Sequence, residues 1–309
     1  MKILVLGAGA TGGYFGGRLF ESGADVTFLV REKRFEILKK NGLHIVSPKG
    51  DVTLSPKLVT ADSLHDSYDL VILSCKAYDL QSSMDSIRSA IKEKTVILPF
   101  LNGIGHLDIL DKEFGQEHVL GGVVYIPATL GSDGEVRHLG ALSKMTFGAR
   151  KESQKAIVEQ FAKIASQAKF DSELSQNVMQ DMWEKFVFLT TLAGMTCLMR
   201  SPVGNIVATD EGEQISLEFL KECESVSAGF GYPVTEKAHK NAVESITQKG
   251  SPATSSMFRD LQNGFRVELD SIVGDMLKRG RAKNLTLPLL RVAYAHLQAY
   301  DYGLKQSQK

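Results

Sequence analysis

The fold is decided by the stretch Lys2–Gly12, which reads KILVLGAGATG. This short apolar strand leads into a Gly-x-Gly-x-x-Gly turn, and a helical segment, Gly13–Ser22, follows. Gly7 permits the tight turn, Gly9 lacks the Cβ that would block a pyrophosphate, and Gly12 allows close packing of the helix. The stretch predicts a dinucleotide site with phosphates at a helix N-terminus. The alternative is a strand-to-helix turn of another doubly wound fold.

The composition favours a small metabolite as the partner of this chain. Its 309 residues are enough for about two domains. Lys and Arg number 36, as do Asp and Glu, so nothing indicates a nucleic-acid surface or a basic membrane anchor. No stretch approaches the roughly 20 apolar residues of a membrane helix. The apolar start of the chain is interrupted by glycines and is interpreted as a strand, not a signal peptide.

The cysteines and histidines give no sign of a metal site. Cys75, Cys197 and Cys223 are far apart and form no CxxC pair, and no HExxH motif occurs. This pattern argues against a disulfide framework or a zinc knuckle and is typical of a reducing cytosol. We therefore expect a cytoplasmic protein without a bound metal.

Strand and helix signals alternate through the first half of the chain. The expected strands are Lys2–Leu6, Asp25–Val30, Leu70–Leu73, Thr95–Phe100 and Val119–Val124. The expected helices are Gly13–Ser22, Lys33–Asn41, Leu80–Lys92, His106–Glu113 and Glu152–Gln167, with a hairpin around Gly131–Gly134. Such alternation predicts an α/β domain of the Rossmann type over residues 1–170, with a mainly parallel, doubly wound sheet.

From residue 171 onward the strand signals vanish and long helical patterns replace them. The expected helices are Gln176–Met199, Asp210–Gly229, Thr235–Thr247, Ser256–Gln262, Glu268–Arg279 and Leu289–Tyr300. Residues 171–309 are therefore predicted to form an all-α domain, which would carry the substrate site. Its apolar helices could support a homodimer.

The end of the second strand indicates which dinucleotide binds. An acidic residue at this place typically binds the ribose hydroxyls of NAD, whereas this chain has Arg31. A guanidinium suits a 2′-phosphate, so NADPH is favoured. Glu32 keeps NAD open, because its side chain could turn inward. Alternatively, these charges only solvate the start of a helix.

Three further residues are candidates for chemistry. Lys76 and Asn102 follow two of the expected strands, where open α/β sheets bind ligands, although both could be plain loop residues. Lys185 lies in the otherwise apolar segment Met182–Leu189. It could extend to the surface, pair with Asp181, or face a cleft with a lowered pKa and act as a general acid.

Taken together, these residues resemble the ketopantoate reductase (2-dehydropantoate 2-reductase) family along nearly the whole chain. Besides the glycine turn and Arg31, the matching motifs are Cys75–Tyr78, Leu101–Gly105, Trp183–Lys185, Ser255–Asp260 and Glu268–Asp270, with Gly274 and Pro288. Their order and spacing are specific, although each is modest alone. The resemblance implies NADPH-dependent reduction of 2-dehydropantoate to (R)-pantoate, in pantothenate biosynthesis.

The resemblance also implies a role for each matching residue. The cofactor would be held by Gly7, Gly9, Ala10, Thr11, Gly12, Arg31, Lys76 and Asn102. Lys185 would be the general acid, and Glu268 would steady it and bind the substrate hydroxyl. Ser256 would bind the substrate carboxylate, and Asn102 would also line the substrate site. Without the resemblance, Ser256 would be interpreted as a helix N-cap and Glu268 as a first-turn carboxylate.

The chain departs from the family pattern where substrate-facing asparagines are usual. It has Leu189 and Ala193 after the lysine, Val273 before Gly274, and Leu290 after Pro288. Fewer amides would make the pocket more apolar. Two alternatives therefore stand beside the main hypothesis: a related reductase of a more apolar 2-oxo acid, and an NADPH-binding protein without turnover.

Overall fold

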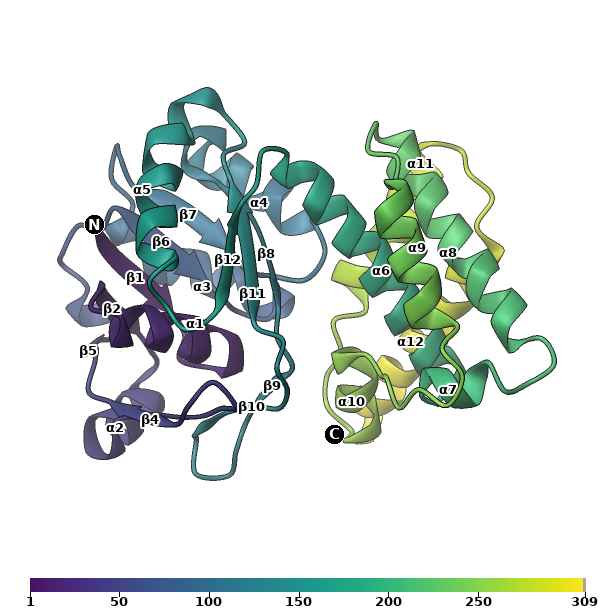
Figure 1. Ribbon diagram of the computed structural model, residues 1–309, viewed down its shortest axis with the longest axis horizontal. Coiled ribbons are helices and arrows are strands. Elements are labelled where there is room, and N and C mark those ends of the chain that lie inside the picture. Colours follow the sequence, from purple (N-terminus) through teal and green to yellow (C-terminus); the bar gives the residue numbers. More distant parts are fainter. Residues whose placement is uncertain (308–309) are drawn as a thin grey trace. The chain divides into compact units, whose positions relative to one another are not determined.

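The computed structural model describes residues 1–307, which form two compact units. Unit 1 comprises residues 1–101 and 106–181, and unit 2 comprises residues 102–105 and those from 182 onward. The first unit contains strands and helices, whereas the described part of the second unit is helical (Figure 1). The division falls inside α6 (Val178–Met199), later in the chain than the expected limit after residue 170.

The main sheet of unit 1 has five parallel strands in the order β5-β2-β1-β6-β7. They are β1 (Lys2–Leu6), β2 (Asp25–Leu29), β5 (Lys57–Val59), β6 (Leu70–Leu73) and β7 (Val96–Pro99). The chain winds outward from β1 in one direction and then continues on its other side with β6. This reversal places a ligand-binding crevice at the carboxyl ends of β1 and β6. The doubly wound Rossmann-like sheet is confirmed.

Five α-helices accompany the strands of unit 1. They are α1 (Ala10–Glu21), α2 (Glu32–Asn41), α3 (Leu80–Ile87), α4 (Gly105–Phe114) and α5 (Lys155–Ala165). Helix α3 was expected to reach Lys92, but a 3₁₀ turn, Arg88–Ala90, replaces its end. Tyr14, Phe15 and Leu19 of α1 are fully buried in the core beside the sheet. Burial of this face fixes the helix that begins at the glycine turn.

Two smaller sheets correct the expected strand pattern of unit 1. The first, β4-β3-β10-β9, contains β3 (Leu43–Val46) and β4 (Val52–Leu54), which the sequence analysis missed, and the predicted hairpin of β9 (Ala128–Leu130) and β10 (Val136–His138). The second, β12-β11-β8, contains β8 (Gly121–Tyr125), β11 (Lys144–Gly148) and β12 (Asp171–Leu174). Strand β8 was expected to continue the parallel series, but it pairs antiparallel with β11. Strand β12 is polar and at most half-buried, so it gave no apolar signal.

Unit 2 is helical, as predicted. Its elements are most of α6, α7 (Val203–Ile206), α8 (Gly212–Gly229), α9 (Glu236–Ile246), α10 (Ser256–Gln262), a π-helical segment η6 (Asp270–Gly274), α11 (Asp275–Ala282) and α12 (Pro288–Ser307). Helix α8 packs against α9, α11 and α12. Within residues 1–307, the single turn α7 was not predicted, and α12 continues to Ser307, beyond its expected end at Tyr300. No helix within residues 1–307 has the length and apolarity needed to cross a membrane.

The close contact at Gly12 generates a stability prediction. A Cβ on Gly12 would overlap the Ser74 hydroxyl and the Gly7 carbonyl. Gly12→Ala should therefore lower the free energy of unfolding by about 2 kcal/mol, as overpacking does. Urea unfolding measures this change. Gly303→Ala is the control, since that helical glycine has open space around it and alanine should preserve or raise stability. An unchanged stability of Gly12→Ala would contradict the packing argument.

Candidate functional site

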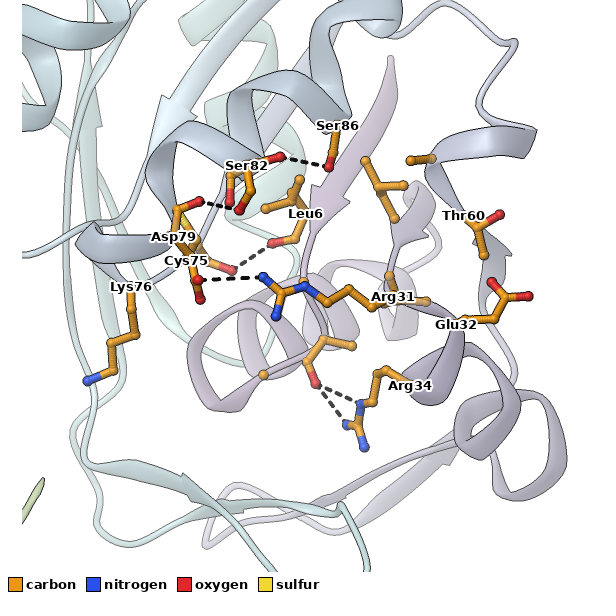
Figure 2. Close-up of a pocket in the computed structure, with 18 of the residues that line it drawn as sticks. Leu6, Arg31, Glu32, Arg34, Thr60, Cys75, Lys76, Asp79, Ser82 and Ser86 are labelled. Carbon is orange, nitrogen blue, oxygen red and sulfur yellow. Dashed lines mark hydrogen bonds and ion pairs between the residues drawn. The ribbon is translucent and has the colours of Figure 1, made fainter. Parts of the chain in front are cut away.

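A cavity of about 710 Å³ opens at the carboxyl ends of β1, β2, β5 and β6 in unit 1 (Figure 2). Its walls include Gly7, Gly9, Arg31, Thr60, Ser74 and Lys76. The strand order reverses here, at the place where open α/β sheets bind ligands. Every lining residue belongs to unit 1, so this cavity is complete within one compact body.

The glycine turn has the geometry that a dinucleotide phosphate requires. Gly7 has a φ of +88°, and Gly9 is the N-cap of α1. A Cβ on Gly9 would meet no other atom of the described chain within 4 Å, unlike one on Gly12. Packing therefore does not explain the missing side chain of Gly9, whereas close approach of a ligand does. The first amides of α1 have no intrahelical acceptor and can donate to phosphate oxygens.

Charged side chains of both signs line the cavity beyond the carboxyl end of β2. The Arg31 side chain is 78% exposed, and its guanidinium lies 3.6 Å from the Asp79 carboxylate. Glu32 extends toward Thr60 instead (Figure 2). Arg34 donates hydrogen bonds to the Ala8 carbonyl. An exposed guanidinium can receive a phosphate, but Asp79 partly offsets its charge.

The predicted cofactor residues fall into three groups. Gly7, Gly9, Arg31 and Lys76 line the cavity, and the Lys76 ammonium extends away from both arginines (Figure 2). Ala10, Thr11 and Gly12 form the first turn of α1. Asn102 belongs to unit 2 instead.

Ser74 and Asp79 also line the cavity, although they were not predicted from the sequence. Ser74 follows β6 directly and donates a hydrogen bond to the Leu6 carbonyl of β1 at 3.1 Å. Like Lys76, Ser74 is a polar residue that follows the buried strand β6, so the same sequence signal predicts it. Thr60 was missed because β5 has only three residues and was not recognised as a strand.

In unit 2, Lys185 is a half-buried ammonium on an apolar helix. Its neighbours on α6 include Met182, Phe186 and Val187, all at most 2% exposed. Burial lowers the pKa of Lys185 to about 8, and the Glu268 carboxylate opposes this by raising it. Desolvation thus dominates over attraction. The structure brings Lys185 and Glu268 into electrostatic contact and gives the lysine a pKa suited to proton transfer near neutral pH.

Glu268 is buried and precedes the π-helical segment η6. Its main-chain carbonyl accepts hydrogen bonds from the Ile272 amide and the Ser271 hydroxyl, both at 3.2 Å. The loop containing Asn102 packs against the same segment, since a Cβ on Gly103 would overlap the Ser271 carbonyl. The fold thereby gathers Asn102, Lys185 and Glu268 within unit 2. π-Helical turns often occur at functional sites.

Ser256 is not the N-cap of α10. The cap is Ser255, whose hydroxyl accepts a hydrogen bond from the Phe258 amide at 3.0 Å and also bonds to the Thr196 hydroxyl at 3.0 Å. Ser255 has the extended backbone that capping requires, with φ −75° and ψ 157°. Ser256 is the first helical residue and is half-buried. Its hydroxyl therefore does not have the capping role assigned to it from the residues alone.

The four residues that replace the usual asparagines differ in exposure. Ala193, Val273 and Leu290 have no exposed surface, so they are core residues in this structure. Leu189, one helical turn after Lys185, is half-buried. Of the four, only Leu189 can present an apolar surface to a ligand.

Comparison with known proteins identifies close relatives. The ketopantoate reductase PanE/ApbA model matches residues 3–152, and the ketopantoate reductase PanE/ApbA C-terminal model matches residues 177–301. The uncharacterized oxidoreductase YkpB of Bacillus subtilis (strain 168) is 37% identical over 305 residues, which cover 97% of this chain and 99% of that protein.

Solved structures show the same architecture. The 2-dehydropantoate 2-reductase of Geobacter metallireducens GS-15 is 28% identical with a TM-score of 0.88, over 97% of this chain and 99% of that one. A D-mandelate dehydrogenase, solved as a ternary complex with NADH and anilino(oxo)acetate, is 24% identical with a TM-score of 0.89, over 99% and 100% of the two chains. The second likeness concerns the fold alone.

The contact between Lys185 and Glu268 generates a prediction that does not depend on turnover. Removing the negative charge with Glu268→Gln should lower the pKa of Lys185 below its value of about 8 in the parent chain. The pKa is measured by NMR titration of ¹³C-methylated lysines. Glu184→Gln is the control, because Glu184 accepts a hydrogen bond from the Thr235 amide and is not among the named causes of the Lys185 pKa shift. Equal shifts in both variants would refute a specific pair.

Proposed function

Because the chain belongs to the ketopantoate reductase family, we propose that it reduces 2-dehydropantoate to (R)-pantoate with NADPH, in pantothenate biosynthesis. The observation that carries this proposal is the half-buried Lys185 beside the buried Glu268 carboxylate. A carbonyl reduction needs a proton donor as well as a hydride, and a lysine with a pKa near 8 can donate at neutral pH and be recharged from water.

Each polar residue of unit 2 has a task in this reaction. Lys185, in its ammonium form, transfers a proton from Nζ to the carbonyl oxygen while C2 of the substrate receives the hydride. Glu268 keeps Lys185 charged in an environment that disfavours charge. The Ser256 hydroxyl donates a hydrogen bond to the substrate carboxylate, and the Asn102 amide orients the substrate. Bound NADPH supplies the hydride.

The cofactor proposal rests on unit 1. The open space at Gly9 accepts the pyrophosphate, and the exposed Arg31 guanidinium pairs with the 2′-phosphate. Asp79 works against the second contact, so NADH is the alternative to be compared in every binding measurement. All three cysteines are free thiols, which supports a cytoplasmic location.

Leu189 favours a second candidate, a reductase of a more apolar 2-oxo acid. An amide at this position could bind a substrate hydroxyl, whereas leucine cannot. The third candidate is an NADPH-binding protein without turnover. The Lys185–Glu268 contact argues against it, because a buried carboxylate and a desolvated ammonium are costly to maintain without a use.

Lys185→Ala separates an enzyme from a binding protein. Loss of the general acid should lower kcat for reduction by about a thousandfold, with NADPH affinity within about twofold of the parent. In the parent, kcat/KM for reduction should be constant below pH 8 and fall above it, because the ammonium is then lost. Stopped-flow absorbance of NADPH measures kcat and the pH dependence of kcat/KM. A parent chain that binds NADPH but turns over no 2-oxo acid would establish the binding protein.

A matched pair of substrates identifies the acid. 2-Dehydropantoate and 3,3-dimethyl-2-oxobutanoate differ by one hydroxyl group, and a site with a partner for that hydroxyl should prefer the former at least tenfold in kcat/KM. A tenfold preference for the deoxy compound would reject 2-dehydropantoate and favour the apolar candidate. Leu189→Asn should then shift the preference toward the hydroxylated acid. Val273→Asn should not, because Val273 is fully buried.

A further inference from the structure

Arg34 lines the cavity and donates hydrogen bonds to the main chain, and neither the glycine motif nor the 2′-phosphate contact accounts for it. Its Nε and Nη2 atoms both donate to the Ala8 carbonyl oxygen, at 3.1 and 2.8 Å (Figure 2). Ala8 is the residue between the two first glycines of the turn. The side chain therefore fastens helix α2 to the dinucleotide turn.

Within residues 1–307 the Arg34 guanidinium has no carboxylate partner. Burial alone lowers its pKa, and no carboxylate in the described part of the chain lies within ion-pair distance of it. Arg31, by contrast, has Asp79. A half-buried, uncompensated guanidinium raises the positive potential of the cavity and costs free energy unless an anion binds there.

The remaining nitrogen of Arg34, Nη1, lies near the β9–β10 hairpin. Nη1 lies against Gly134, at the tip of the β9–β10 hairpin, where an added Cβ would come within 2.5 Å of it. The two bonds to the Ala8 carbonyl use Nε and Nη2, so this edge of the guanidinium is not available for a bidentate phosphate contact. Arg31 is 78% exposed and keeps such an edge. The two arginines are therefore placed for different tasks.

We infer that Arg34 is a positioning residue for the cofactor pyrophosphate and acts through the Ala8–Gly9 peptide. The inference rests on the proposed dinucleotide site. A peptide group is planar, so holding the Ala8 carbonyl on one side directs the Gly9 amide to the other. Within residues 1–307 no hydrogen bond from the Gly9 amide is formed, and the space at Gly9 is open. The cation also polarises this peptide and strengthens its N–H as a donor.

Nucleotide fragments separate this task from 2′-phosphate binding. Calorimetry is carried out on the full chain with NADPH, NADH, ADP-ribose and adenosine 2′-monophosphate. Arg34→Met should weaken the first three by a common factor of about tenfold or more, because all carry a pyrophosphate, and leave adenosine 2′-monophosphate within about twofold. Arg31→Ala should weaken NADPH and adenosine 2′-monophosphate only.

Two further variants guard against a purely structural effect. Arg34→Lys keeps the charge but cannot donate two bonds in one plane to Ala8, so its loss should fall between those of the parent and Arg34→Met. Lys33→Ala removes an exposed cation beside Arg34 that does not line the cavity, and should leave all four affinities unchanged. Urea unfolding of each variant shows whether it is folded.

The outcomes are distinct. A loss in Arg34→Met confined to NADPH and adenosine 2′-monophosphate would overturn the inference and make Arg34 a 2′-phosphate ligand. If Arg34→Met leaves all four affinities unchanged but lowers the free energy of unfolding, the inference is overturned and Arg34 only stabilises the fold. If the parent binds none of the four compounds, the proposed cofactor site fails, and this inference fails with it.

Discussion

The close approach of helix α1 to the carboxyl ends of β1 and β6 is the constraint on which the cavity of unit 1 depends. Gly12 has no side chain, so the first turn of the helix lies directly against the Gly7 carbonyl and the Ser74 hydroxyl. Ser74 in turn bonds to the Leu6 carbonyl and joins β6 to β1. The packing at Gly12 thereby sets how closely the first amides of α1 approach the carboxyl ends of β1 and β6. The buried aromatic residues of α1 keep the helix in this place.

Each unit of this protein contains a cationic side chain in a poorly solvated environment. Arg34 and Lys185 are both partly removed from water, and burial lowers the pKa of each. They differ in their partners, since Lys185 has the Glu268 carboxylate, whereas the partner of Arg34 among residues 1–307 is the neutral Ala8 carbonyl. A paired ammonium is suited to exchanging a proton, whereas a permanently charged guanidinium is suited to fixing a peptide and attracting an anion.

The π-helical segment explains how Glu268 is held. The amide of Gly274 bonds to the Leu269 carbonyl at 2.8 Å, five residues back, which widens the helix at this point. The loop at Gly103 packs on the Ser271 carbonyl of the same segment. Two stretches that are far apart in the chain, around Asn102 and around Glu268, are thus joined through main-chain contacts that a residue pattern does not reveal.

The sequence by itself determined the doubly wound sheet, its glycine turn and the helical second unit, because apolar periodicity and glycine spacing are local signals. Lys185 could be singled out for the same reason, as a charge in an apolar helix. Only the tertiary structure decided that β8 pairs antiparallel and that Ser255 caps α10. It also decided that Asn102 belongs to unit 2 and that Arg34 donates hydrogen bonds to the Ala8 carbonyl. It also showed that Ala193, Val273 and Leu290 are core residues. Each of these depends on contacts between residues distant in the chain, and no local pattern encodes which surfaces meet.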